Sequence, residues 1–339
     1  MSQILSEQEF KDQVVSLYTD VVGEKVGGSI VNFSDEWFAA AENLIKPKAP
    51  IRDATKFVYS GAWYDGWETR RHNTEEADWV TIKFGVSSAK IIGTEIDTAF
   101  FNGNHAPAIT VECTHLEEGQ SLDHANWDLV IEKTECGPSQ RHFFKRSSIT
   151  EKSYTHARLK QYPDGGIARF RLYGEVVPHL DSIKANSIID LASVGFGGVA
   201  VKCSDQHFGS ADNLLLPGRG HDMSDGWETK RSRQPGHVDW VIIKLGAKTN
   251  INEIVIDTAH FRGNFPQKIA IDGLSTNEVI PTHDDSKWVS IIKPTKTTAD
   301  KEHSFTELEN IDQSYTHVKL TIIPDGGVKR VRVLGTIVK

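Results

Sequence analysis

The stretch that decides the fold is Asp65-Gly66-Trp67-Glu68-Thr69-Arg70-Arg71, because the chain contains it twice. It returns 160 positions later as Asp225-Gly226-Trp227-Glu228-Thr229-Lys230-Arg231. The Asp-Gly pair indicates a tight turn, since glycine accepts a positive φ without steric cost. A turn that carries an indole, a carboxylate and two cations is typical of loops that handle polar ligands. The alternative is that Trp67 and Trp227 anchor the turns in a core.

Further matches extend this repeat through most of the sequence. They pair 78–80 with 239–241, 97–104 with 257–264, 153–156 with 314–317 and 163–166 with 324–327. The offset is 160 or 161 in these segments but 170 at Ser34-Asp35 and Ser204-Asp205. We attribute the wider offset to a short opening loop in the first repeat or to a long linker. The pattern predicts a duplicated domain, with repeats at 1–178 and 187–339 and a linker at 179–186.

Strand periodicity dominates both repeats. Val80, Ile82 and Phe84 alternate with polar neighbours, and the same period of two continues at 92–96, 109–113 and 127–131. Each repeat ends in two strands joined by Pro-Asp-Gly-Gly. Short strands without intervening helices predict an all-β protein made of two tandem antiparallel jelly-roll β-sandwiches. The closing strands resemble those of galactose-binding-like jelly rolls. One short N-terminal helix is expected over 6–22, with a capping box at Ser6 and Glu9.

Composition excludes several classes of partner. The net charge of −8 argues against nucleic acid as a partner. No apolar run reaches membrane-spanning length, and the N-terminus lacks a signal-peptide pattern. The three cysteines are far apart and have no zinc or disulfide spacing. We therefore expect a cytoplasmic protein whose substrate is a small molecule, with no nucleic-acid or membrane partner.

Candidate site residues lie on the duplicated turn and on the loop after 97 or 257. The first repeat offers Glu68 and His105 as catalytic groups and Trp67, Arg71, Asn102 and Asn104 as binding groups. The second offers Glu228 and His260 as catalytic groups and Trp227, Arg231, Arg262 and Asn264 as binding groups. Arginine suits a carboxylate, and amide side chains suit a ureido group. Asp97 and Asp257 could equally serve only to hold loop N–H groups.

The sequence leaves the presence of a metal open. It has no HExxH motif or other fixed ligand spacing, so no cofactor is firmly predicted. A divalent metal could still be assembled across strands by His72, His105, Glu68 and Asp65. A second possible set is His237, His260 and Glu228.

Several long motifs carry a resemblance to a known family. They are 65–72, 96–107, 137–142, 162–174, 216–237 and 323–330, and they resemble the allantoicases of fungi. The resemblance covers about Gly27 to Gly335. It implies a homo-oligomeric hydrolase that acts on carbon–nitrogen bonds in linear amidines. Its reaction converts allantoate and water to ureidoglycolate and urea, a step in purine and allantoin breakdown.

The roles of individual residues follow from the chemistry of that substrate. Allantoate has one carboxylate and two ureido groups on one carbon, so its cleavage requires a cationic clamp, a proton donor and a base. We expect Arg231 or Arg262 to act as the clamp and Glu228 or His260 to exchange protons. The first repeat would hold a modified copy of this site. The alternative function is a non-catalytic carbohydrate-binding module, because the fold does not fix the function.

Overall fold

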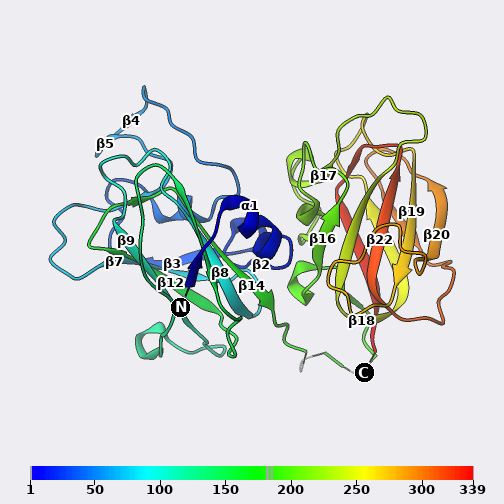
Figure 1. Ribbon diagram of the computed structural model, residues 1–339, viewed down its shortest axis with the longest axis horizontal. Coiled ribbons are helices and arrows are strands. Elements are labelled where there is room, and N and C mark those ends of the chain that lie inside the picture. Colours follow the sequence, from blue (N-terminus) through cyan, green and yellow to red (C-terminus); the bar gives the residue numbers. More distant parts are fainter. Residues whose placement is uncertain (1, 181–182, 185, 339) are drawn as a thin grey trace. The chain divides into compact units, whose positions relative to one another are not determined.

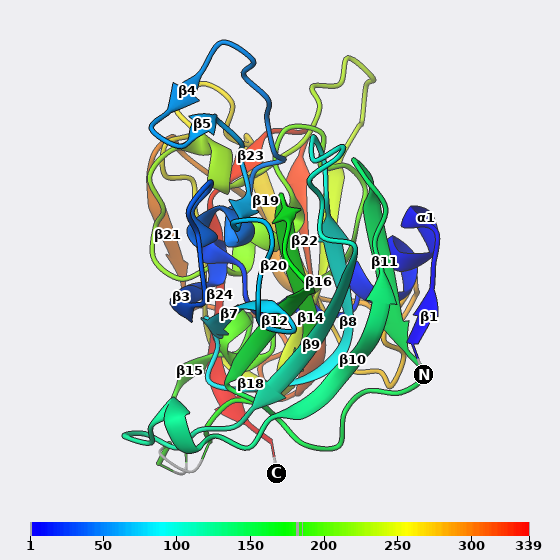
Figure 2. The same cartoon turned by 90° about the vertical axis from the view of Figure 1, so that its left-hand side faces the viewer.

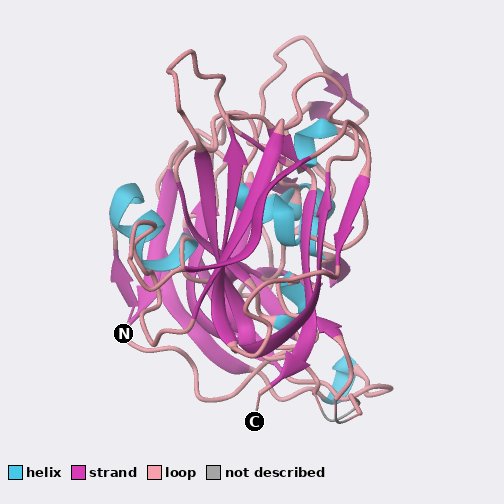
Figure 3. Ribbon diagram, turned by 90° about the vertical axis from the view of Figure 1, so that its right-hand side faces the viewer, coloured by secondary structure: helices cyan, strands magenta, loops and turns pink. Residues whose placement is uncertain are grey.

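The computed structural model describes residues 2–180, 183–184 and 186–338 (Figure 1), and the chain divides into two compact units, Met1–Pro178 and His179–Lys339. Strands are the predominant regular structure of each unit (Figure 3). The linker predicted at 179–186 includes residues 181, 182 and 185, which lie outside the described residues. Within the described part of the chain, no helix has the length and apolar character needed to cross a membrane.

The first unit is a sandwich of two five-stranded antiparallel sheets. One sheet has the order β1-β11-β8-β14-β2, with bounds Ser2–Ile4, Arg141–Arg146, Ala89–Asp97, Arg169–Val176 and Thr19–Asp20. The other has the order β10-β9-β12-β7-β3, with bounds Asp128–Glu135, Ala108–Thr114, His156–Tyr162, Asp78–Lys83 and Ser29–Phe33. In Figure 2 this unit faces the viewer. The predicted fold class is therefore confirmed.

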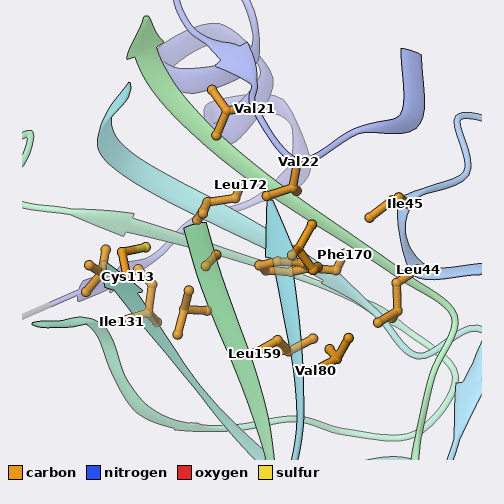
Figure 4. Close-up of a cluster of buried hydrophobic side chains, with 14 of the residues drawn as sticks. Val21, Val22, Leu44, Ile45, Val80, Cys113, Ile131, Leu159, Phe170 and Leu172 are labelled. Carbon is orange, nitrogen blue, oxygen red and sulfur yellow. The ribbon is translucent and has the colours of Figure 1, made fainter. Parts of the chain in front are cut away.

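The core of the first unit lies between the two sheets. Phe170 and Leu172 of β14 share one buried cluster with Val80 of β7 and Leu159 of β12 (Figure 4). These residues alternate along their strands with polar residues, as the period of two predicts. Burial of such side chains contributes roughly 1.5–3 kcal/mol each. The core thus fixes the register of the strands from which the rim loops emerge.

The N-terminal helix is shorter than the sequence predicts. Its capping box at Ser6 and Glu9 is present, but α1 (Glu7–Phe10) continues only as a wider π-helical turn to Val15. Phe10 and Val14 pack on Ile92, Phe143 and Tyr173, on the outer side of the first sheet. The predicted range of 6–22 is wrong beyond 15, because the next residues enter β2 and join that sheet.

The second unit repeats this sandwich with one difference. Its long strand β18 (Asp239–Asp257) pairs first with β22 (Tyr315–Ile323) and then with β24 (Arg330–Ile337), so it belongs to both layers. The first unit divides the same stretch into β7 and β8. The other strands are β15 (Ile189–Asp190), β16 (Val199–Cys203), β19 (Lys268–Leu274), β20 (Val289–Lys296) and β21 (Glu302–Phe305).

Short elements complete the rims. Two small ribbons pair β6 (Trp67–Glu68) with β13 (Gly166–Ile167), and β17 (Trp227–Glu228) with β23 (Gly327–Val328). Short 3₁₀ segments occupy Glu24–Val26, Ala41–Ile45, Leu122–His124, Val194–Phe196, Ala211–Leu215 and Met223–Asp225.

The alternation predicted for 127–131 fails at Leu129, which is exposed because β10 has register shifts on either side of Ile131.

A projecting hairpin explains the change in repeat offset. Strands β4 (Phe57–Val58) and β5 (Gly61–Ala62) form it, and it extends beyond the rim of the first unit (Figure 2). The second repeat has ten fewer residues between Ser204 and Asp225 than the first has between Ser34 and Asp65. The explanation by a short opening loop or long linker is therefore wrong, because the first repeat carries an insertion. Tyr59 at its tip is 97% exposed.

Candidate active site

The duplicated turn lies at one rim of each sandwich. In the first repeat, Trp67 and Glu68 form β6, and Glu68 lies opposite Gly166, in the segment that follows the Pro163-Asp164-Gly165 turn. Gly165 has φ +150°, and an added Cβ would lie 2.7 Å from the Ala106 backbone, so glycine is required there. This close approach brings the turn, the loop after β8 and the loop after β12 together at one place.

The two tryptophans of the turns anchor the core. Trp67 and Trp227 are each 0% exposed. Their indole nitrogens donate to the carbonyl oxygens of Asp35 (2.8 Å) and Asp205 (2.9 Å). The expectation that they bind substrate is therefore wrong, because a ligand has no access to either ring. They hold the carboxylates that follow them, Glu68 and Glu228, at the rim.

Glu68 is the centre of a polar cluster in the first repeat. Its Oε1 accepts hydrogen bonds from Asn104 Nδ2 (2.8 Å) and Arg71 Nη2 (3.1 Å). Arg71 also reaches Asp164 Oδ1 at 3.4 Å, so one guanidinium bridges two carboxylates. Burial raises the pKa of Glu68, and the Asn104 hydrogen bond and the Arg71 charge oppose the rise only in part. A carboxyl group with a raised pKa is suited to proton transfer.

His105 follows Asn104 on the same loop and is half-buried. Its Nδ1 is buried and has no hydrogen-bond partner among the described residues. Burial lowers the pKa of nearby His142, and the charge of His105 lowers it further, against an opposing hydrogen bond with Gly137. The loop therefore brings an imidazole and an amide to the rim. Asn102 of the same loop is exposed.

The second repeat keeps the carboxylate–amide pair but changes its surroundings. Glu228 Oε1 accepts a hydrogen bond from Asn264 Nδ2, as Glu68 does from Asn104. Arg231 instead donates from Nη2 to the Gly263 carbonyl at 3.1 Å, and it is exposed. Among the described residues, Arg231 makes no salt bridge, in contrast to Arg71. Phe265 occupies the position of His105.

The other candidates of the second repeat lie on the loop after β18. Arg262 is exposed, and its Nε donates to Asp300 Oδ2 at 3.2 Å. The backbone N–H of His260 donates to the other oxygen of Asp300 at 2.8 Å. His260 has φ 69°, as Phe100 at the same place in the first repeat has φ 70°. This loop conformation is therefore shared, whereas its side chains differ.

Several aspartates hold the loops in place. Asp97 and Asp257 accept the N–H groups of Ala99 (2.8 Å) and Ala259 (2.9 Å), as the structural alternative for them expects. Asp65 forms a buried salt bridge of 2.7 Å with Arg169. Within residues 2–180, 183–184 and 186–338, no three His, Cys, Asp or Glu side chains are placed to hold a metal ion. Neither of the two ligand sets considered from the sequence is therefore assembled.

The sequence interpretation missed a cavity beside this cluster. It measures about 660 Å³ and is lined by the segment from Arg70 to Trp79 and by Arg158, Lys160 and Tyr162 of β12. Arg71 contributes to both the cavity and the Glu68 cluster. The signal in the sequence was Trp79 and Arg158, which recur as Trp240 and Lys319 at the offset of 161.

Two β-sandwiches, each with a carboxylate–amide pair on a rim turn, define a duplicated jelly-roll protein with a duplicated polar site. Residues 19–177 and 189–338 each match the allantoicase repeat. The allantoicase of Saccharomyces cerevisiae is 60% identical over 98% of both chains. That of Neurospora crassa is 54% identical over 93% of this chain and 90% of its own. The chain belongs to the allantoicase family.

A solved structure gives the same result. The crystal structure of the Saccharomyces cerevisiae allantoicase matches with a TM-score of 0.88 and 56% identity. The match covers 99% of this chain and 100% of the other. The family predicted from the sequence motifs is confirmed, and these comparisons favour the enzyme over the carbohydrate-binding module.

Proposed function

We propose that the chain is a hydrolase that converts allantoate and water to ureidoglycolate and urea. The observation that carries this proposal is the match over nearly the full length to allantoicases, at 60% identity to the one from Saccharomyces cerevisiae. The reaction breaks the bond between the central carbon and one ureido nitrogen. That nitrogen receives a proton and leaves as urea, and the hydroxyl of a water molecule bonds to the carbon.

The geometry of the first repeat supports a role for Glu68 in proton transfer. A carboxyl group whose pKa is raised by burial retains a proton closer to neutral pH, and it can donate that proton to the leaving nitrogen. Asn104 and Arg71 fix the carboxyl group through Oε1. His105 would accept the proton of the attacking water, since its half-buried imidazole lies on the same loop as Asn104. Asn102 and Asn104 would bind the ureido arm.

The second repeat would use a different arrangement of the same parts. Glu228 is held by Asn264, and His260 lies on the loop that follows β18. Arg231 or Arg262 would clamp the substrate carboxylate, because both are exposed and arginine binds carboxylates through two parallel hydrogen bonds. In this proposal, each repeat supplies its own candidate acid and base.

The test is urea release from allantoate by the purified chain, followed over time and compared with a sample without protein. Steady urea release supports the proposal, and a chain that releases none would overturn it. Treatment with a chelator separates a metal-dependent reaction from one that uses protein side chains alone. Activity that survives chelation indicates a reaction carried out by protein side chains alone, and loss of activity that added metal restores indicates a metal-dependent one.

Two matched variants, Glu68→Gln and Glu228→Gln, assign the chemistry to a repeat. Each keeps the size of the side chain but removes its titration. Loss of one positioned acid costs roughly 10²–10⁴-fold in kcat. Loss confined to one variant identifies the catalytic repeat. Full activity in both would exclude these carboxylates as the acid.

A cytoplasmic location and a homo-oligomeric assembly are also part of the proposal. Both rest on the resemblance to the family. Sedimentation of the purified chain tests the assembly, and a single species at the mass of one chain, 37.7 kDa, would refute it.

A further inference from the structure

Each repeat carries a cation packed on indole rings at the outer face of a sheet, with two indoles in the first repeat and one in the second. In the first repeat, the Arg158 guanidinium carbon lies 4.0 Å from the ring centre of Trp127 and 5.0 Å from that of Trp79. In the second repeat, Lys319 takes the place of Arg158, and its Nζ lies 5.0 Å from the ring centre of Trp288. We call this arrangement the cation–indole platform.

The second repeat covers its own platform. The imidazole of His283 stacks on Trp240 with ring centres 4.4 Å apart and planes inclined by 4°. The carbonyl oxygen of the same residue accepts a hydrogen bond from Lys319 Nζ at 2.9 Å. Lys319 also forms a salt bridge of 3.2 Å with Asp272. One residue thus places a flat group on the indole and an oxygen on the cation.

The first repeat leaves its platform open. Trp79 and Arg158 line the cavity of about 660 Å³, and Leu122 occupies the sequence position that corresponds to His283. Glu112, the counterpart of Asp272, forms its salt bridge with Lys160 at 2.7 Å. Among the described residues, Arg158 makes no salt bridge. Its Nε donates a long hydrogen bond of 3.5 Å to Thr81.

The charge of Arg158 is poorly satisfied by the protein. Burial lowers the pKa of its guanidinium, and Glu112 opposes this only in part. Four acidic groups line the cavity, namely Asp35, Glu75, Glu76 and Asp78. Asp35 pairs with Arg70, Asp78 accepts a hydrogen bond from Ser34, and among the described residues none of the four forms a salt bridge with Arg158. An anion that reaches Arg158 therefore takes the place of the water that the guanidinium lost on burial. It displaces no carboxylate from the guanidinium.

We propose that the open platform of the first repeat binds allantoate, with the carboxylate on Arg158 and a planar ureido group on the Trp79 indole. This inference rests on the proposed function and assigns its substrate to residues outside the duplicated turn. His283 shows within the same chain what the platform accepts: a flat conjugated group with an oxygen directed at the cation. Arg71, which lines the same cavity, connects the bound substrate to the Glu68 cluster.

The test compares Arg158→Gln with Lys319→Gln in steady-state urea release from allantoate by the full chain. Removal of a charged hydrogen-bond partner from a bound carboxylate weakens binding about tenfold or more. We therefore expect Arg158→Gln to raise KM at least about tenfold and to change kcat much less. Lys319→Gln should leave KM within about twofold, because the second platform is covered.

Arg158→Lys is measured as well, in case Arg158→Gln fails to fold. It keeps the stem and charge but loses the two-pronged donor, so it should raise KM by less than Arg158→Gln. An unchanged KM in both Arg158 variants would overturn the inference, and so would an equal rise in Lys319→Gln. If the unmodified chain releases no urea, the proposed function fails. Calorimetric titration of the unmodified chain and of Arg158→Gln with allantoate then tests the platform separately. Loss of binding in Arg158→Gln supports the platform, and unchanged binding overturns it.

Discussion

The salt bridge between Asp65 and Arg169 links the first copy of the duplicated turn to β14. Asp65 Oδ2 accepts from Arg169 Nη2 at 2.7 Å and from the Ile51 backbone N–H at 3.0 Å, and the side chains are only 9% and 4% exposed. Asp65→Ala therefore leaves a buried guanidinium without its counterion. Breaking a buried pair in this way costs about 3–5 kcal/mol.

The value expected for Asp65→Ala is near the lower end of that range, at about 3 kcal/mol. Three backbone carbonyls, those of Lys48, Asp65 and Ala168, still accept hydrogen bonds from Arg169 after the change. The assay is guanidinium chloride unfolding of the full chain, followed by tryptophan fluorescence. Activity should fall as well, because Asp65 is three residues before Glu68.

Lys152→Ala is the matched control for Asp65→Ala. Its salt bridge with Asp128 is similar in length at 2.8 Å, but the side chains are 71% and 41% exposed. Such a surface pair contributes about 0–1 kcal/mol. Equal losses in the two variants would refute the reasoning, because burial would then have no effect on the cost.

Two further predictions concern the loop packing and a half-buried acid. Gly166→Ala would place a Cβ 2.2 Å from the Phe101 ring and cost about 1–3 kcal/mol in an unfolding experiment, whereas Gly103→Ala, on the loop that carries Phe101, meets nothing within 4 Å and should have little effect. Burial raises the pKa of Asp20 from its ordinary value of 3.8 to about 6, against the opposing charge of Arg171. Because the pKa of Asp20 is higher in the folded state, its protonated carboxyl group contributes stability below about pH 4. This contribution is lost as the pH rises through about 6. Unfolding measured at pH 4.5 and 7.5 should therefore differ less in Asp20→Asn than in the unmodified chain, and an equal difference would contradict the assignment.

The sequence was sufficient for the features that depend on periodicity and repetition. Alternation of apolar residues predicted the strands around Val80, Ile96 and Phe170, because a sandwich buries one face of each strand. The recurrence of a seven-residue turn predicted the duplication. Glu68 and Asn104 were selected as one site from different segments, and the structure brings them within 2.8 Å.

Other features depend on contacts that a linear pattern does not contain. The polar sequence around Trp67 suggested an exposed ring, but the indole has a carbonyl partner 32 residues away and packs in the core. The helix pattern continued through Val21, whose burial comes instead from the core of the sandwich. The Arg158 platform brings together residues of β7, β12 and the segment before β10, so only the folded sheet reveals it.

The long strand β18 has a consequence for how the two layers of the second unit are joined. It pairs with β22 up to Lys244 and with β24 from Thr249, so one stretch of peptide is hydrogen-bonded in both layers. The first unit has the same interruption between Lys83 and Ala89, and Ala89 bridges to Tyr154 as Thr249 pairs with Tyr315. In each repeat this segment ties one sheet to the other, and we therefore expect the two layers of each unit to unfold together.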